Sequence, residues 1–300
     1  VLVVGGGPAG LSAAAAAADA SAQVMLVERD DRLGGRTLGR EPLVERLIER
    51  LSTDKRIELL TSAEAVGWYD EGVIAVDRTP DLLILEPQAV VLATGAYDAG
   101  LPFPDWDLPG VMFATAAQRL LDRHGVKPGS RAVVLTTDDA GHHAAGRLAE
   151  GAVEVVCIAD RRRSEMVPTD VLEAAAGAGV PVVGGATAAR AHGFERVNAL
   201  SVLTTHARRP RRYRCDLVCI SAGVRPADDL AYQATARGSL VLAPSVAVTA
   251  QPAAAAGGPA LWLAGLVNGA DTPASAREQG SAAGAAAVRG SRYPWPATEE

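Results

Sequence analysis

The chain has 300 residues and a formal net charge of −6; 48% of the residues are hydrophobic and 21% are charged. This length predicts about two domains, and the negative charge argues against a nucleic-acid partner. No uninterrupted apolar run reaches the roughly 18 residues that a membrane span needs. Three cysteines are too few for a disulfide framework, so we expect a reducing, cytoplasmic location. Because the chain opens inside a strand and without methionine, we expect a segment of a longer polypeptide.

The first motif follows a hydrophobic strand at residues 1–4 and reads Gly5-x-Gly7-x-x-Gly10. Gly5 permits a tight turn, Gly7 lets the backbone approach a pyrophosphate, and Gly10 lets the next helix pack close to the strand. That helix, expected at Leu11–Ala18, would offer its unpaired N-terminal amides to the phosphates. The pattern predicts a dinucleotide-binding βαβ unit; the alternative is a glycine turn in some other αβ unit.

An acidic residue follows the second strand of this unit, which we expect at Gln23–Val27. Glu28 lies about 20 residues past the glycines, where a carboxylate can accept hydrogen bonds from both hydroxyls of an adenine ribose. Glu28 disfavours a 2′-phosphate on that ribose, although Arg29 beside it weakens the preference. These residues leave the choice between NAD and FAD open.

The rest of the chain alternates strand and helix signals, which is typical of a doubly wound α/β fold. Up to residue 95 we expect a loop at 32–36, a helix at 42–51, a small β-meander of strands at 57–60, 63–69, 73–76 and 81–85, and a buried strand at 89–95. Beyond a proline-rich connector at 102–109 we expect helices at 114–124, 140–151 and 168–178, strands at 131–136, 153–159, 180–183 and 215–220, and a β-meander over 187–213. Strands at 246–249 and 261–264 and a helix at 274–287 complete the chain.

The unit at residues 131–159 repeats the first βαβ unit, and Asp160 closes its second strand as Glu28 closes the earlier one. We therefore expect an α/β fold with two Rossmann-like dinucleotide-binding domains, the second inserted in the first, and small β-meanders. The first domain would take residues 1–105 plus 240–300, and the second would take residues 106–239.

The second unit lacks the glycines of the first, because its loop reads Thr136-Thr-Asp138-Asp139-Ala-Gly141. Two carboxylates at the place of a pyrophosphate would repel it, at a cost of about 1–4 kcal/mol for each charge pair depending on screening. We expect this degenerate loop to bind no nucleotide, so that the chain holds one dinucleotide at the first site.

Other polar or reactive residues have a structural interpretation that we favour. Cys215 and Cys219 would be buried on one face of a strand rather than redox-active. His142-His143 would be a polar helix end rather than a metal site, and Arg161–Arg163 a solvated turn rather than a phosphate grip. The run Arg208–Arg214 fits a hairpin tip and is a candidate contact for a partner subunit. We expect no catalytic residue and no metal.

Further glycines occur in an informative order: Gly34-Gly35, Thr94-Gly95 and the late strand Leu261–Gly265. Their spacing resembles the two-dinucleotide-binding-domain flavoproteins of the pyridine nucleotide-disulfide oxidoreductase type, over essentially the whole chain. Members of that superfamily that hold FAD end the late strand with Gly-Asp, whose carboxylate binds the ribityl chain. Here Leu266 follows Gly265, so the resemblance favours NAD over FAD.

Three stretches are similar to the α subunit of heterotetrameric sarcosine oxidase: Val66–Asp70, Asp107–Met112 and Gly125–Gly129. The last two are shared with opine oxidase, hydroxyproline dehydrogenase and cyanide synthase subunits, whereas the polar loop at 136–139 and Leu266 favour sarcosine oxidase. In that family the α subunit binds NAD⁺ noncovalently, and amine oxidation occurs at FAD on the β subunit. An FMN at the α/β interface passes electrons to oxygen, and a folate domain captures the one-carbon unit.

The resemblance implies an NAD⁺-binding domain that works with a flavin-bearing β subunit, together with further small subunits. The whole enzyme would oxidise the CH–NH group of sarcosine, transfer the one-carbon unit to tetrahydrofolate and form H₂O₂. The implied cofactor-binding residues are Gly5, Gly7, Pro8, Ala9 and Gly10 for the pyrophosphate, Glu28 for the ribose, and Arg29, Gly35, Arg36, Thr37, Thr94, Gly95 and Gly265 around them. Two alternatives stay open: an FAD-dependent oxidoreductase subunit that acts on an opine, proline or hydroxyproline, and a non-catalytic scaffold subunit.

Overall fold

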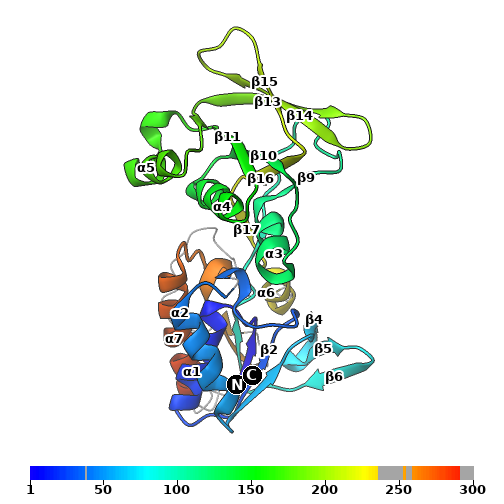
Figure 1. Ribbon diagram of the computed structural model, residues 1–300. Helices are drawn as coiled ribbons and strands as arrows, with labels where there is room; N and C mark the ends of the chain where they lie inside the picture. The colour runs from blue at the N-terminus through cyan, green and yellow to red at the C-terminus, as the bar shows by residue number, and fades with distance from the viewer. Residues whose placement is uncertain (38, 236–252, 255–258, 291–300) are drawn as a thin grey trace. The chain divides into compact units, whose positions relative to one another are not determined.

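The computed structural model describes residues 1–290 except 38, 236–252 and 255–258. The chain divides into a first unit, Val1–Tyr97 with Pro226–Glu300, and a second unit, Asp98–Arg225 (Figure 1). This division falls earlier in the chain than the expected crossing at 105/106, and the other expected crossing at 239/240 lies outside the described residues. The segments that link the two units, β8 (Ala96–Asp98) and β17 (Val224–Pro226), pair as a two-stranded ribbon.

The first unit is built on a six-stranded sheet in the order β18-β19-β7-β1-β2-β3. Its strands are β18 (Ala253–Ala254), β19 (Ala260–Leu263), β7 (Ala89–Leu92), β1 (Leu2–Val4), β2 (Val24–Val27) and β3 (Ile57–Leu60). All neighbours pair in parallel except β18 with β19. The near-continuous apolar runs of β1, β2 and β7 suit parallel strands, which are buried on both faces.

Helices cover one face of this sheet: α1 (Pro8–Asp19), α2 (Pro42–Thr53) and α7 (Pro273–Gly290). Figure 1 shows them grouped together, and their apolar residues form one core with Val3, Leu26 and Trp262 of the strands. Because side chains alternate along a strand, Leu2, Val4 and their neighbours form a second core on the opposite face.

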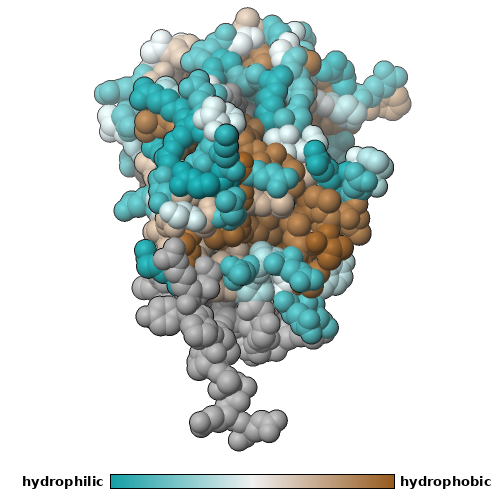
Figure 2. Space-filling view, turned by 90° about the horizontal axis from the view of Figure 1, so that it is seen from below, coloured by the Kyte–Doolittle hydropathy of each residue, from teal (hydrophilic) through white to brown (hydrophobic). Residues whose placement is uncertain are grey.

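A three-stranded antiparallel meander and a short helix cover that opposite face: β4 (Glu64–Trp68), β5 (Ile74–Arg78), β6 (Asp81–Leu85) and α6 (Asp229–Thr235). The expectation that residues 57–60 belong to the meander is wrong, because β3 pairs in parallel with β2 in the six-stranded sheet. We did not expect α6. The other surface of β6 exposes Leu82 and Ile84, and Figure 2 shows hydrophobic side chains gathered on the underside of the molecule.

The second unit has a five-stranded parallel sheet in the order β12-β11-β10-β16-β9. Its strands are β12 (Val182–Val183), β11 (Glu154–Asp160), β10 (Arg131–Thr136), β16 (Leu217–Ser221) and β9 (Val111–Phe113). Helices α3 (Ala114–His124), α4 (Asp139–Glu150) and α5 (Thr169–Gly177) pack on one face. An antiparallel sheet of β13 (Ala186–Gly193), β14 (Val197–Thr204) and β15 (Arg211–Arg214) packs on the other. The expected meander at 187–213 is confirmed.

The three cysteines are free and buried in the cores of the second unit. Burial raises the pKa of the Cys157 and Cys215 thiols to about 11 and that of Cys219 to about 12. The thiolate is the reactive form of cysteine, and the expected burial of Cys215 and Cys219 is confirmed. The expectation that they share one face of a strand is wrong, because Cys215 precedes β16 and lies in the core against the meander, whereas Cys219 lies in the core on the helix side of the sheet. In the described part of the chain, no helix is both long and apolar enough to span a bilayer.

Two glycines of α7 allow it to contact the backbone of α1 directly. A Cβ at Gly280 would lie 2.0 Å from the Ala9 carbonyl oxygen, and one at Gly284 would lie 2.1 Å from the Ala13 carbonyl oxygen. A side chain at either position would force the helices apart. The alanine-rich sequence of α1 offers only small side chains to the same interface.

We expect Gly280→Ala to lower the free energy of unfolding by about 1–3 kcal/mol, because the added methyl group overpacks the α1–α7 contact. The matched control is Gly146→Ala in α4, where a Cβ meets nothing within 4 Å. That control should raise stability by about 0.5–1 kcal/mol, the usual preference for alanine in a helix. Urea denaturation of both variants checks the prediction, and equal effects would contradict it.

Candidate functional site

The turn between β1 and α1 is set by two glycines that contact backbone atoms. Gly5 has a φ of +107°, and a Cβ there would lie 2.2 Å from the carbonyl oxygen of Ala93 at the end of β7. A Cβ at Gly10 would lie 1.8 Å from the Gly5 carbonyl oxygen. No other residue fits either position, so these two glycines fix where α1 begins relative to the sheet.

Gly7 differs from both, because the protein itself leaves room for a side chain there. Its backbone is extended, with a φ of −79°, and a Cβ would have the Gly35 Cα at 4.0 Å as its nearest neighbour. Gly7 is the N-cap of α1, and no side chain among the described residues caps this helix. The amides of Ala9 and Gly10 therefore remain for an anion, beside open space at Gly7.

Glu28 follows β2 and is nearly buried, with 9% of its surface exposed. Its Oε2 accepts a hydrogen bond from the Gly6 amide at 2.6 Å, and its Oε1 accepts one from the Asp30 amide at 2.8 Å. A carboxylate has about four acceptor sites, so about two remain beyond the hydrogen bonds that the described residues donate. Glu28 thus also ties the glycine turn to the end of β2, a role that the sequence did not indicate.

The glycine pair after β2 brings a loop over the first turn. Gly35 has a φ of +56°, and a Cβ there would lie 3.0 Å from the Gly7 Cα. In the 3₁₀ turn Gly35–Thr37, the Thr37 hydroxyl donates to the Gly34 carbonyl at 2.7 Å. Arg36 donates from a terminal guanidinium nitrogen to the Ala96 carbonyl at 2.9 Å. The structure therefore places Arg36 and Thr37 as ties that hold this loop.

Two further strand ends lie at the same edge of the sheet, after β7 and β19. Thr94 donates from its hydroxyl to the Ala227 carbonyl at 2.6 Å, and Gly95 has a φ of +79° with nothing within 4 Å of a Cβ. A Cβ at Gly265 would lie 2.8 Å from the Ala9 Cβ, so Gly265 is next to the start of α1. The carboxyl edge of a parallel sheet is where ligands bind in such folds.

The structure brings twelve of the thirteen expected site residues to this edge of the first unit. The exception is Arg29, whose exposed guanidinium lies 4.0 Å from a Glu64 carboxylate oxygen. Sequence reasoning missed Gln279, whose Oε1 accepts hydrogen bonds from the Gly265 amide at 3.0 Å and from the Asn268 side chain at 3.1 Å. Gln279 is 14 residues after Gly265, and no spacing rule connects the two.

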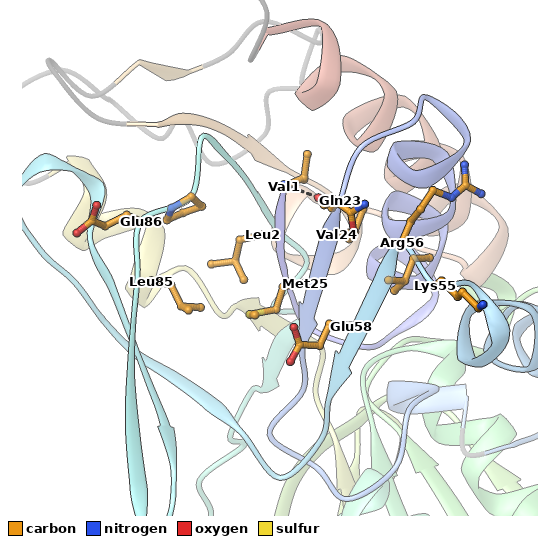
Figure 3. Close-up of a pocket in the computed structure, with 12 residues that line it drawn as sticks. Val1, Leu2, Gln23, Val24, Met25, Lys55, Arg56, Glu58, Leu85 and Glu86 are labelled. Atoms are coloured by element: carbon orange, nitrogen blue, oxygen red, sulfur yellow. Dashed lines mark hydrogen bonds between the residues drawn. The ribbon is translucent and has the colours of Figure 1, made fainter.

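A separate cavity of about 360 Å³ lies at the opposite edge, where β1, β2 and β3 begin. Figure 3 shows Leu2, Met25 and Leu85 facing one another in it, with Glu58 and Glu86 at its margins. The glycine turn follows the carboxyl end of β1, where ligands of parallel sheets bind. This cavity lies at the other ends of the strands and is therefore distinct from the glycine-turn site.

In the second unit, the protein's own side chains occupy the corresponding loop. Asp138 caps α4: its Oδ1 accepts hydrogen bonds from the Gly141 amide at 3.1 Å and the Ser221 hydroxyl at 2.8 Å. A Cβ at Gly141 would lie 2.2 Å from the Thr136 hydroxyl oxygen, so Gly141 repeats the steric role of Gly10. The Asp138 carboxylate thus takes the helix amide that a phosphate would need.

Asp160, the counterpart of Glu28, is fully buried, and both of its carboxylate oxygens take part in hydrogen bonds. Arg162 donates to it from its backbone amide at 2.8 Å and its side chain at 2.9 Å, and the His142 Nε2 lies 2.8 Å from its Oδ2. Burial raises the pKa of Asp160, but hydrogen bonds from His142 and Arg162 outweigh burial and lower it below the ordinary value. Arg162 also pairs with Asp139 at 2.7 Å.

Two expectations about this region are therefore wrong. His142 is a buried partner of Asp160 rather than part of a polar helix end, because the parallel pairing of β10 and β11 brings the end of β11 beside α4. Within Arg161–Arg163, Arg162 is partly buried and bound to two carboxylates rather than solvated. The described residues contain no group of three or more His, Cys, Asp or Glu side chains arranged to hold a metal ion.

Two units, each with a mostly parallel sheet, a strand–turn–helix motif and an antiparallel meander, define a two-dinucleotide-binding-domain oxidoreductase fold. The profile of the pyridine nucleotide-disulphide oxidoreductase family matches residues 1–265, and the chain belongs to that family. Thioredoxin reductase of T. acidophilum has a similar structure, with a TM-score of 0.76 and 17% identity over 96% of this chain and 97% of that one. L-proline dehydrogenase of P. horikoshii gives a TM-score of 0.69 and 22% identity over 96% of this chain and 54% of that one.

Curated relatives confirm the resemblance to sarcosine oxidase. The chain is 31% identical to the alpha subunit of sarcosine oxidase from Corynebacterium sp. (strain P-1), over 96% of this chain and 32% of that protein. It is 28% identical to an opine oxidase subunit of Agrobacterium tumefaciens (strain Ach5), over 55% of this chain and 37% of that protein. The chain therefore spans only about a third of the length of these relatives.

We expect Arg162→Met to lower the free energy of unfolding at pH 7 by about 3 kcal/mol, because it leaves the buried Asp160 carboxylate short of its cationic partner. The lowered pKa of Asp160 gives the native protein stability that is present above the ordinary carboxyl pKa and lost as pH falls through the folded value. The difference between variant and wild type should therefore shrink on acidification.

The control is Arg161→Met, since Arg161 is exposed and, within the described part of the chain, is bound through its backbone amide alone. It should change stability by less than about 0.5 kcal/mol. Urea denaturation at pH 7 and at the lowest pH that preserves the fold measures both effects. A pH-independent difference for Arg162→Met would contradict the role given to Asp160.

Proposed function

We propose that the first unit binds one dinucleotide, NAD⁺, at the glycine turn. The diphosphate would lie over Gly7 on the amides of α1, and the adenine ribose would bind the free acceptor sites of Glu28. When bound, NAD⁺ supplies a hydride acceptor. The residues that would hold it are Gly5, Gly7, Pro8, Ala9, Gly10, Glu28, Gly35, Arg36, Thr37, Thr94, Gly95 and Gly265, with Arg29 at the margin. The second unit, Asp98–Arg225 rather than the expected 106–239, would be a Rossmann-like domain without a nucleotide.

One observation carries this proposal: the fold requires glycine at residues 5 and 10 but not at residue 7. A Cβ at Gly7 would point into space that the protein does not fill, beside uncapped helix amides. An anionic ligand that lies against the backbone explains both features, because it needs the amides and excludes a side chain.

The late strand supports NAD⁺ over FAD. Leu266 stands where the flavoprotein resemblance calls for a carboxylate, and a leucine cannot accept hydrogen bonds from a ribityl chain. The preceding Gly265 amide already donates to Gln279. The chain therefore offers the diphosphate and ribose contacts common to both cofactors, without the acceptor expected for the flavin half.

We further propose that the chain is the NAD⁺-binding part of a sarcosine oxidase α-like subunit in an amine-oxidising, cytoplasmic flavoenzyme. Amine oxidation would occur on a flavin-bearing β subunit, and FMN would bind at a subunit interface. The complex would also contain further small subunits. It would transfer a one-carbon unit to tetrahydrofolate and form H₂O₂. The similarity to the alpha subunit of sarcosine oxidase over nearly the whole chain supports this. The similarity to the opine oxidase subunit supports the alternative of an opine, proline or hydroxyproline substrate.

Gly7→Ala should weaken NAD⁺ binding at least tenfold, about 1.4 kcal/mol, because the methyl group would occupy the place of the diphosphate. It should leave the free energy of unfolding within about 0.5 kcal/mol of wild type, since the φ of Gly7 suits alanine and no protein atom is crowded. Gly10→Ala is the contrasting control, because its Cβ would meet the Gly5 carbonyl oxygen and the fold would be lost or weakened. Unchanged NAD⁺ affinity in a folded Gly7→Ala protein would refute the site.

Calorimetric titration with NAD⁺ and with FAD separates the two cofactors, together with an absorption spectrum of the purified protein. We expect one NAD⁺ per chain and no tightly bound flavin at the first site. A yellow protein that retains stoichiometric FAD and ignores NAD⁺ would select the flavoenzyme alternative. A protein that binds neither, yet still assembles with its partners, would select the scaffold alternative.

A further inference from the structure

One face of the sheet β13–β14–β15 carries three arginines and a histidine, beside Ser201 and the apolar residues Ala188, Ala199 and Leu203. Cross-strand partners share a face, and the register places Arg190, Ser201 and Arg212 in one row and His192, Ala199 and Arg214 in the next. The opposite face carries Ala191, Leu200 and Tyr213, which are buried in the core. We call the residues Arg190, His192, Arg212 and Arg214 the arginine face (β13–β15 in Figure 1).

Two of the three arginines of this face have no counter-charge among the residues that the structure describes. Arg212 and Arg214 are exposed and form no ion pair with any residue that the structure describes, and the same holds for Arg208 and Arg209 in the turn before β15. Burial, followed by the positive charges of Arg212 and Arg190, lowers the pKa of His192. These unpaired cations are concentrated on a chain whose net charge is −6.

The fold gains nothing evident from Arg212 and Arg214. Both side chains are exposed, they lie two residues apart on one face of β15, and their partners on β14 are the uncharged Ser201 and Ala199. Arg211 is different, because its guanidinium lies 5.0 Å from the centre of the Tyr213 ring in a cation–π contact. Arg212 and Arg214 therefore form no ion pair or cation–π contact within the described part of this unit.

One contact within the unit shows that an arginine of this face pairs with a carboxylate. The Asp105 carboxylate reaches the face and accepts a hydrogen bond from the Arg190 Nε at 3.0 Å. Guanidinium groups match carboxylates in geometry and form charge-assisted hydrogen bonds with them. Beside the face, Phe194 in the turn between β13 and β14 is 94% exposed, and exposed aromatic residues beside arginines are typical of protein interfaces.

We propose that the arginine face docks an acidic surface of a partner protein. On the proposed function, from which this step follows, the partner is another subunit of the same oxidoreductase. Its carboxylates would pair with Arg212 and Arg214 as Asp105 pairs with Arg190.

The test compares charge reversal on the face with the same charge change elsewhere. Arg212→Glu/Arg214→Glu should weaken oligomer assembly of the full-length enzyme at least tenfold, measured by mass photometry across a dilution series at 150 mM salt. Arg212→Lys/Arg214→Lys keeps the charge and should retain most of the assembly. The matched control, Arg46→Glu/Arg78→Glu, makes an equal charge change at exposed residues outside the face and should change assembly less than twofold.

Poly-L-glutamate and single-stranded DNA of equal charge serve as probes on the same proteins, with unfolding midpoints as the check on folding. The proposal is supported if the protein binds poly-L-glutamate more tightly than DNA and if Arg212→Glu/Arg214→Glu loses that binding. This readout also applies to protein that is purified without its partner subunits. Tighter binding of DNA, or assembly unchanged by charge reversal, overturns it. NAD⁺ titration of each sample separates the two proposals. If the wild-type protein does not bind NAD⁺, the proposed function is wrong, but the loss of assembly in Arg212→Glu/Arg214→Glu can still be measured.

Discussion

In the first unit, glycines at a few close backbone contacts determine where α1 lies relative to the sheet and to α7. At Gly5 and Gly10 the turn after β1 touches its own helix and the end of β7 so closely that a single added carbon would overlap a carbonyl oxygen. Gly280 repeats this constraint from the side of α7, against the same first turn of α1. Main-chain contacts with the turn after β1 and with α7 thereby fix the N-terminus of α1, whereas no protein atom crowds the position of a Cβ at Gly7.

The second unit reaches the same topology by a different chemistry. Its loop keeps the steric glycine at Gly141, but polar side chains replace the other two glycines. Asp138 satisfies the helix amide, and Asp160 is enclosed by His142 and Arg162. The repulsion expected from Asp138 and Asp139 is therefore only part of the reason to expect no nucleotide here. The groups that would bind one are already hydrogen-bonded within the protein.

Local patterns predict those elements that local physics determines. The strand at 131–136 and the helix at 114–124 agree with the structure residue for residue, because a continuous apolar run and a 3.6-residue periodicity are visible in the sequence itself. The partner of a short strand is not visible in this way, so the prediction for β3 assigns it to the wrong sheet. Helix α6 has seven residues, too few to show a period, and is held by burial of Leu230 and Ala231.

The candidate site shows the same division between local and long-range information. The glycine turn and Glu28 carry a spacing that can be recognised directly, whereas the contacts of Gln279 with Gly265 and of His142 with Asp160 arise only after parallel strands align. Arg36 and Thr37 are expected near a ligand on grounds of position, and in the structure their side chains donate to backbone carbonyls. Long-range hydrogen bonds therefore set the details that spacing leaves undetermined.

The internally satisfied loop of the second unit has a consequence for the lifetime of the protein in a cell. A ligand that binds only the folded state stabilises it, by about 2.7 kcal/mol when present at a hundredfold excess over its Kd. With the proposed site, the first unit would receive that support only while its nucleotide is abundant, whereas the second unit carries its own replacement for the phosphate in Asp138. When nucleotide becomes scarce, proteolysis would thus begin in the half of the chain that depends on it.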